Sequence, residues 1–109
     1  MALLPVEMAA LTDLRRWLEG RFDRRLLELR LFGSRARGEG HPESDLDVLV
    51  VVHELTSAER REVGHFSGDL LTRHGVLVAP LALSAAELDL LRARERRIVA
   101  EIDRDGVPV

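Results

Sequence analysis

Apolar residues recur at three- and four-residue intervals near the start of the chain. This spacing predicts an amphipathic helix over residues 6–20, with an apolar stripe formed by Met8, Leu11, Leu14 and Leu18. Gly20 supplies a helix stop. Trp17 lies beside the stripe, and we expect it to pack against a sheet rather than to stack on a nucleic-acid base.

Three later runs have the composition of β-strands. Residues 26–32 (LLELRLF) show partial alternation, and residues 46–52 (LDVLVVV) form a nearly unbroken apolar run. Such a run is typical of a central strand that is covered on both faces. The third run, residues 76–83 (VLVAPLAL), contains Pro80, which cannot donate a ladder hydrogen bond. We therefore expect the third strand to lie at a sheet edge or to contain a bulge.

Two capping-box patterns introduce further helices. One starts at Thr56 and predicts a helix to about His74; the other starts at Ser84 and predicts a helix to about Asp103. The residues spaced to face the core are Val63, Phe66 and Leu70 in the first helix and Leu88, Leu91, Ile98 and Ile102 in the second. The element order is α-β-β-α-β-α. It predicts an α/β (α+β) fold, with a small mixed β-sheet backed by helices, in one domain over residues 1–109.

Composition excludes several kinds of site. The chain has no cysteine, so it has neither a disulfide framework nor a thiolate metal site. All 16 basic residues are arginine, which rules out a lysine nucleophile or a P-loop lysine. The net charge of −3 and the aromatic content of 4% argue against general nucleic-acid binding.

The N-terminal residues lack a basic segment followed by an apolar one, so we expect no signal peptide. No apolar run approaches the length of a bilayer span, and we expect no membrane association. A cytoplasmic protein is the simplest interpretation.

Two carboxylates precede and enter the predicted central strand. Because strand side chains alternate faces, Asp45 and Asp47 point the same way, while Leu46 and Val48 point into the core. Neighbouring carboxylates repel each other unless a cation lies between them. Mg²⁺ suits this geometry, since it commonly takes one or two carboxylates and fills its remaining positions with phosphate and water.

A Gly-Ser turn follows the first predicted strand. Gly33 allows the backbone to approach a ligand closely, and successive amides in such a turn, with Ser34, form a nest for an anion. Arg35 and Arg37 follow at once and are suited to pairing with phosphate oxygens. This stretch therefore predicts a phosphate-binding turn beside a magnesium site.

The complete stretch, GSRARG, a loop and SDLDVLVV, resembles the signature of the minimal nucleotidyltransferases, a family within the DNA polymerase β-like superfamily. The signature, Gly-Ser, ten residues and Asp-x-Asp, is met by Gly33, Ser34, Asp45 and Asp47. The resemblance implies a nucleotidyltransferase-like fold, ATP as the substrate and Mg²⁺ as the cofactor, with Asp45 and Asp47 as catalytic metal ligands. The residues it implies in nucleotide and phosphate binding are Gly33, Ser34, Arg35, Arg37 and Ser44.

One expected group is missing. In the family, a third carboxylate from a later strand completes a two-metal site. The predicted strand over residues 76–83 contains no acidic residue, and Ala79 or an apolar neighbour takes that place. Asp69 and Glu54 are poorly placed to substitute. Glu39 and Glu43, on the loop that also carries His41, remain as alternatives.

Two functions are left open. One is Mg²⁺-dependent transfer of a nucleoside monophosphate, AMP from ATP, to a hydroxyl acceptor. The other is a catalytically impaired binding or antitoxin subunit. Family members are commonly paired with a HEPN-domain protein in toxin–antitoxin modules, so the resemblance implies such a partner. We also expect no second domain for a small acceptor, so a partner or a dimer mate would have to bring the acceptor.

Overall fold

The computed structural model describes residues 3–38, 45–94 and 96–109. Among these residues, the elements are α1 (Pro5–Phe22), a 3-10 turn (Asp23–Arg25), β1 (Leu26–Phe32), β2 (Leu46–Val52), α2 (Ser57–His74), β3 (Val78–Leu83), α3 (Ala85–Arg94), α4 (Arg96–Asp105) and β4 (Val107–Pro108). The sheet has the strand order β3-β2-β1-β4. β1 runs antiparallel to β2 and β4, whereas β2 and β3 are parallel. This is the predicted mixed β-sheet of an α/β fold.

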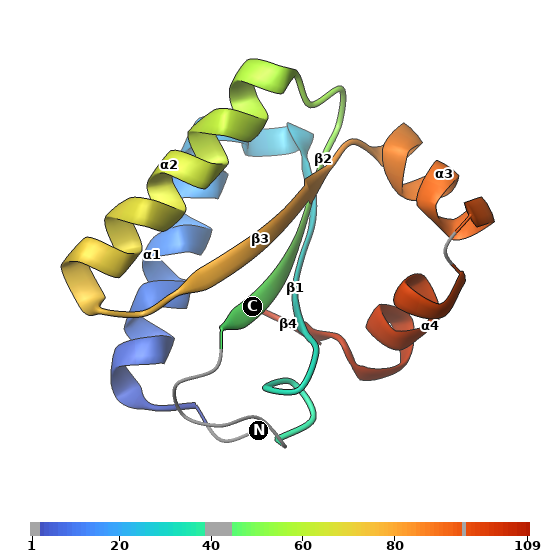
Figure 1. Ribbon diagram of the computed structural model, residues 1–109. Helices are drawn as coiled ribbons and strands as arrows, with labels where there is room; N and C mark the ends of the chain where they lie inside the picture. The colour runs from blue at the N-terminus through green and yellow to red at the C-terminus, as the bar shows by residue number, and fades with distance from the viewer. Residues whose placement is uncertain (1–2, 39–44, 95) are drawn as a thin grey trace.

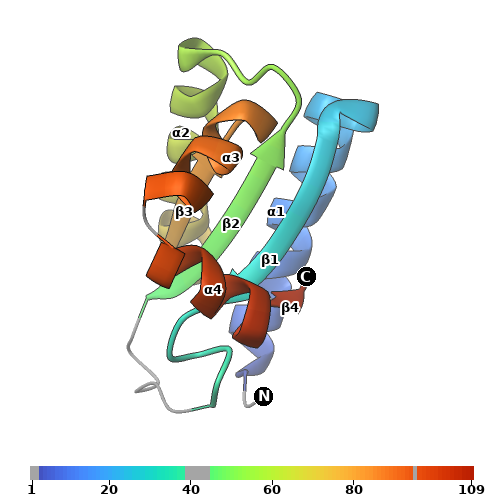
Figure 2. The same ribbon diagram turned by 90° about the vertical axis from the view of Figure 1, so that its right-hand side faces the viewer.

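Helices cover both faces of the sheet. Helices α1 and α2 lie against one face, and α3 and α4 lie on the other (Figures 1 and 2). The alternation of β2 sends its side chains to both layers. Its even-numbered residues pack with α1 and α2, and Leu49 and Val51 pack with Leu88 and Ile102. The continuous apolar run of β2 follows from this double coverage, as the sequence predicted.

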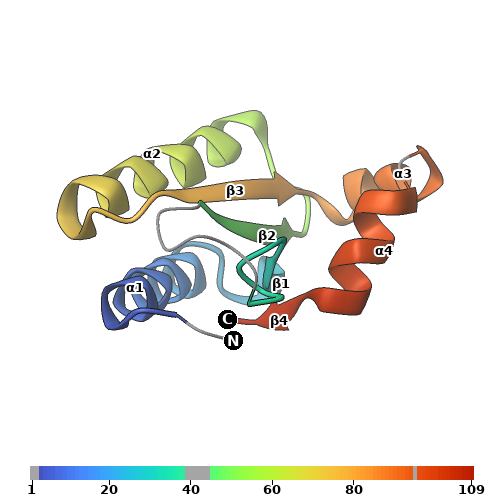
Figure 3. The same ribbon diagram turned by 60° about the horizontal axis from the view of Figure 1, so that its bottom comes forward.

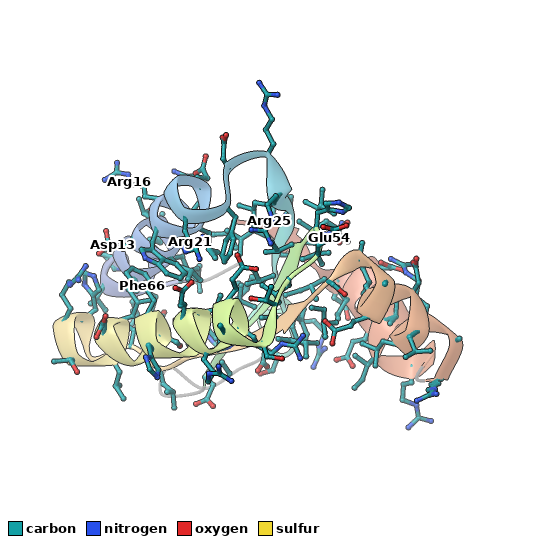
Figure 4. All side chains as sticks on the ribbon, turned by 90° about the horizontal axis from the view of Figure 1, so that it is seen from above. Asp13, Arg16, Arg21, Arg25, Glu54 and Phe66 are labelled. Atoms are coloured by element: carbon teal, nitrogen blue, oxygen red, sulfur yellow. The ribbon has the colours of Figure 1, made fainter. Side chains whose placement is uncertain are left out.

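β3, which contains Pro80, is an edge strand, so that prediction is confirmed. Trp17 is partly buried and stacks on Phe66 of α2 with ring centroids 4.7 Å apart. It thus packs against α2 and against the buried core that α1 and α2 form with the sheet (Figure 4 labels Phe66 between α1 and α2).

The inward face of α1 differs from the predicted stripe at one position. Met8 was expected to face the core, but it is 57% exposed, and Glu7 is buried instead. The buried face of α1 is therefore rotated slightly about the helix axis from the predicted stripe. Its buried residues are Glu7, Ala10, Leu11, Leu14, Leu18 and Phe22. A buried carboxylate requires a hydrogen-bonding or charged partner. Arg35, in the turn after β1, is such a partner for Glu7.

The prediction of one continuous helix at the end of the chain is wrong. Two helices, α3 and α4, replace the single helix over residues 84–103, and α4 leads into the short strand β4. Ile98 is correspondingly exposed, and Val99 is buried. A straight helix would have run past the sheet. Because the chain changes direction between α3 and α4, Ile102 packs against Leu49 and Val51, and α4 covers the second face of the sheet.

The N-terminus of α2 is closed by a charged capping box. Glu59 accepts a hydrogen bond from the Thr56 amide at 3.0 Å, and the Thr56 hydroxyl accepts one from the Glu59 amide at 3.1 Å. Arg25 donates to both carboxylate oxygens of Glu59, at 2.7 and 2.8 Å. These contacts, with Arg25 contributing most, lower the pKa of Glu59 from 4.5 to about 2.

This pKa predicts a defined acid dependence of stability. Because the folded pKa lies below the unfolded one, the Glu59 contacts stabilise the protein fully above pH 4.5 and lose their effect as pH falls toward 2. The difference in unfolding free energy between the wild type and Glu59→Gln should therefore be constant near neutrality and shrink over that window. Urea unfolding at a series of pH values measures it. A difference that grows on acidification would contradict the prediction.

Among the described residues, no helix is both long and apolar enough to cross a membrane.

Candidate functional site

The two aspartates lie where β2 begins, beside the turn that follows β1. Asp47 is paired in register with Phe32, the last residue of β1. Asp47 alternates with Leu46 and Val48, so its carboxylate lies on the sheet face covered by α3 and α4. Asp45 precedes the strand and is exposed. Figure 3 shows this end of the sheet, with the turn drawn in front of β1.

Gly33 is required at the start of the turn for two reasons. Its φ of +79° lies in the left-handed region that favours glycine. A Cβ atom added there would lie 2.5 Å from Oδ2 of Asp47. The backbone of the predicted phosphate turn is therefore in direct contact with the predicted metal ligand, because Gly33 has no side chain.

Gly33→Ala should damage both stability and the site. A residue with a Cβ in the left-handed region costs about 1–2 kcal/mol, and the clash would displace Asp47. We expect a lower unfolding free energy and the loss of Mg²⁺-dependent ATP binding, measured by urea unfolding and calorimetry. Gly20→Ala is the control, since it lies within α1 with no atom within 4 Å of an added Cβ. ATP binding by Gly33→Ala at wild-type affinity would contradict the assignment.

Ser34 begins a compact turn. The Gly33 carbonyl accepts hydrogen bonds from the amides of Ala36 and Arg37, at 3.2 and 3.3 Å, and Ser34 is half-buried. These bonds hold the residues after Gly33 in a tight turn beside Asp47.

The two arginines of the turn point to opposite faces of the sheet. Arg35 is buried and reaches the N-terminus of α1, where its Nη2 lies 2.6 Å from Oε1 of Glu7. Arg37 reaches α4, where its Nη1 lies 2.6 Å from Oε1 of Glu101 and 3.6 Å from Oδ2 of Asp105. Arg37 therefore lies on the same sheet face as Asp47, whereas Arg35 lies on the other face.

The electrostatics of Asp47 indicate a site suited to a cation. Burial raises the pKa of the Asp47 carboxyl, and the negative charges of Asp45 and Glu101 raise it further. A bound cation would relieve this repulsion. Sequence reasoning missed Glu101, because nothing in the pattern of residues 84–103 indicated that the chain turns back and brings α4 beside β2.

The third family carboxylate is absent from β3. Ala79 is the direct register partner of Asp47 on the parallel strand β3. Ala79, or an apolar neighbour, was expected to take the place of that carboxylate, and this stays a prediction. Of the substitutes considered, Asp69 is exposed on α2 and Glu54 lies beyond the far end of β2.

The donor set fits Mg²⁺ with a partial protein ligand shell. Among the described residues, no group of three or more His, Asp or Glu side chains is arranged to hold a metal ion. Asp45 and Asp47 nevertheless provide two hard oxygen donors at one strand end, which is enough for Mg²⁺ when phosphate and water complete its shell. Ser44, His41, Glu39 and Glu43 lie outside the described residues, so the predicted role of Ser44 in nucleotide binding stays a prediction.

Comparison with known proteins gives a family match over most of the chain. Residues 14–102 match the nucleotidyltransferase domain. A protein of Methanocaldococcus jannaschii, provisionally named a protein adenylyltransferase, is 36% identical over 52 residues. That match covers 47% of this chain and 52% of the relative, so the chain spans about half the length of the curated relative it matches.

Solved structures share the fold. A structure provisionally named a minimal nucleotidyltransferase matches with a TM-score of 0.60 and 24% identity over 100% of both chains. A toxin–antitoxin crystal structure with AMP-PNP matches with a TM-score of 0.61 and 21% identity, over 96% of this chain and 72% of the other. A nucleotidyltransferase-type structure from Sulfolobus solfataricus has a TM-score of 0.54 and 22% identity, over 93% of this chain and 77% of that one.

Proposed function

The chain belongs to the nucleotidyltransferase domain family, and on this premise we propose that it transfers AMP from ATP to a hydroxyl group of a partner protein, with Mg²⁺ as the cofactor. The observation that carries the proposal is the contact between the Gly33 turn and Asp47, because it joins a phosphate-binding turn to a carboxylate pair at one end of the sheet.

Each residue then has a distinct role. Asp45 and Asp47 would hold Mg²⁺, which supplies positive charge to the triphosphate and orients it. Ser34 and the turn amides would bind the β- and γ-phosphates. Arg37, on the Asp47 face, would exchange its contact with Glu101 for a phosphate oxygen and neutralise charge in the transition state.

The proposed reaction is a substitution at the α-phosphorus of ATP. The acceptor oxygen forms a bond to that phosphorus as the bond to the bridging oxygen breaks, pyrophosphate leaves, and the acceptor proton passes to solvent. Catalysis of this kind depends on positioning and electrostatic stabilisation more than on covalent chemistry by the protein. A rigid turn beside two carboxylates suits that demand.

We propose a HEPN-domain toxin as the partner that brings the acceptor hydroxyl, with this chain as the antitoxin. The proposal is supported by the resemblance of the signature to minimal nucleotidyltransferases and by the toxin–antitoxin context of one structure with the same fold. A dimer mate is the other possible source of the acceptor.

Transfer of label from [α-³²P]ATP tests the proposal directly. The purified chain is incubated with labelled ATP, Mg²⁺ and a HEPN-domain protein encoded beside its gene, and label on protein is measured after electrophoresis. We expect label on the partner that requires Mg²⁺ and is lost in Asp45→Asn. Label that persists in Asp45→Asn would contradict the assigned site.

The second candidate function is binding without transfer. It is favoured by Ala79, the register partner of Asp47, because an alanine there adds no carboxylate to the metal site. In this case the chain would bind Mg²⁺ and ATP and would also bind its partner, but no AMP would be transferred. Partner neutralisation that persists with a non-hydrolysable ATP analogue distinguishes it from the first candidate.

A further inference from the structure

The pair formed by Arg35 and Glu7 is distinguished by its burial. The two side chains are each 4% exposed, whereas each other ion pair between described residues, such as Arg25 with Glu59, includes a more exposed group. Oε1 of Glu7 accepts hydrogen bonds from Arg35 at 2.6 Å and from the Leu4 amide at 2.8 Å. Burial alone would raise the pKa of Glu7, but these bonds outweigh it and the pKa is lowered. Glu7 is therefore ionised at neutral pH.

This contact joins two segments of the site end of the molecule. Glu7 lies in the first turn of α1, and Arg35 lies two residues after Gly33 in the phosphate turn. The Arg35 carbonyl also accepts a hydrogen bond from the Gly38 amide at 3.3 Å. The middle of the turn is thus fixed to α1 on one sheet face, while Arg37 contacts α4 on the other.

We propose that Arg35 is a positioning residue, which tethers the phosphate turn to α1 through Glu7 and so fixes the direction of the turn amides, rather than a residue that binds phosphate itself. This inference rests on the proposed nucleotide site and deepens it. Moving the Arg35 guanidinium onto a phosphate would leave the Glu7 carboxylate buried without its partner, which is strongly unfavourable. Arg37 is then the arginine of the turn that meets the triphosphate.

The Glu7→Gln variant distinguishes a positioning role of Arg35 from direct phosphate binding, because the two roles predict opposite changes in the affinity for ATP. The glutamine oxygen can still accept the hydrogen bond from the Leu4 amide, but the negative charge is removed. If Arg35 bound phosphate directly, releasing it from Glu7 would leave the affinity for ATP unchanged or raise it. If Arg35 positions the turn, the affinity should fall by at least about tenfold, the loss that supporting groups around a metal site commonly cause.

The chain offers a closely matched control. Glu59 has the same place in α2 that Glu7 has in α1, since it accepts the N-cap amide and pairs with an arginine distant in sequence, Arg25. That pair lies at the opposite end of the sheet, and Figure 4 shows Arg25 there near Glu54. Glu59→Gln should lower stability and leave the affinity for ATP at the wild-type value.

A double variant separates stability from positioning. Glu7→Gln removes the negative charge of Glu7 from beside the buried Arg35, whereas Glu7→Gln combined with Arg35→Met replaces the ion pair by two neutral groups of similar length. Replacing both members of a buried pair is often neutral for stability. We expect the double variant to recover much of the stability lost in Glu7→Gln, but not the affinity for ATP.

The experiment combines calorimetric titration of ATP with Mg²⁺ and hydrogen exchange of the amides of residues 34–38 without nucleotide. We expect weaker binding and at least about tenfold faster exchange in Glu7→Gln, with neither change in Glu59→Gln. Wild-type affinity in Glu7→Gln, or equal losses in the two variants, would overturn the inference. A wild-type chain that binds no ATP would instead overturn the proposed function, and with it the phosphate role of the turn, whatever the exchange rates show about the tether.

Discussion

Asp47→Asn is expected to abolish the Mg²⁺-dependent binding of ATP and to raise the melting temperature of the ligand-free protein. Binding should weaken by at least about 100-fold, since even groups that only support a metal ligand commonly contribute 10- to 100-fold. The gain in stability has a separate cause. Burial and the charges of Asp45 and Glu101 disfavour the ionised carboxylate, as its raised pKa indicates.

The size of the stability gain is limited by solvent. Asp47 is partly exposed, so the repulsion is screened and amounts to about 0.5 kcal/mol. In a domain of this size such a change raises the melting temperature by about 2–4 °C. Calorimetric titration and thermal unfolding measure the two effects. Asp69→Asn, an exposed change on α2, should alter neither. A variant that loses stability along with binding would indicate a structural role for Asp47.

Ala79→Asp is expected to raise AMP transfer by at least about tenfold. Ala79 is the register partner of Asp47, and register partners on adjacent strands point to the same face. An aspartate there would stand beside the carboxylate pair and supply the group that the family pattern places on this strand. A second metal ion held by the added carboxylate would stabilise the developing charge by several kcal/mol, so the expected gain is a lower bound.

Ala79→Asn is the matched control, because it adds nearly the same volume without the charge. Label transfer from [α-³²P]ATP, measured for the wild type and the two variants, gives the comparison. Ala79→Asp should also melt at a lower temperature without metal and recover with Mg²⁺, since a third carboxylate adds repulsion. Equal rates in the two variants would mean that the missing carboxylate does not limit transfer.

The sequence was most informative where the pattern was local. The bounds of β1 and β2, the capping boxes at Thr56 and Ser84, and the edge position of the strand with Pro80 all depend on neighbouring residues. The nearness of Gly33 to Asp47 follows from strand pairing, since Asp47 is the register partner of Phe32, the residue before Gly33.

What the sequence did not predict depends on contacts distant along the chain. The buried position of Glu7 depends on Arg35, 28 residues later. Likewise, the nearness of Glu101 to Asp47 depends on the reversal between α3 and α4, which helical periodicity does not encode. The prediction that Arg35 and Arg37 both bind phosphate was based on their closeness in the sequence. The backbone turn directs the two side chains to opposite faces of the sheet.

The central claim is that Asp45, Asp47 and the Gly33 turn together hold a metal-bound nucleoside triphosphate. The most direct measurement is a crystal structure of the protein with Mn²⁺ and a non-hydrolysable ATP analogue, with anomalous scattering used to locate the metal. We predict an anomalous peak within coordination distance of both aspartates and the β- and γ-phosphates over the amides that follow Gly33. A nucleotide bound elsewhere, or a metal in contact with neither aspartate, would contradict the claim.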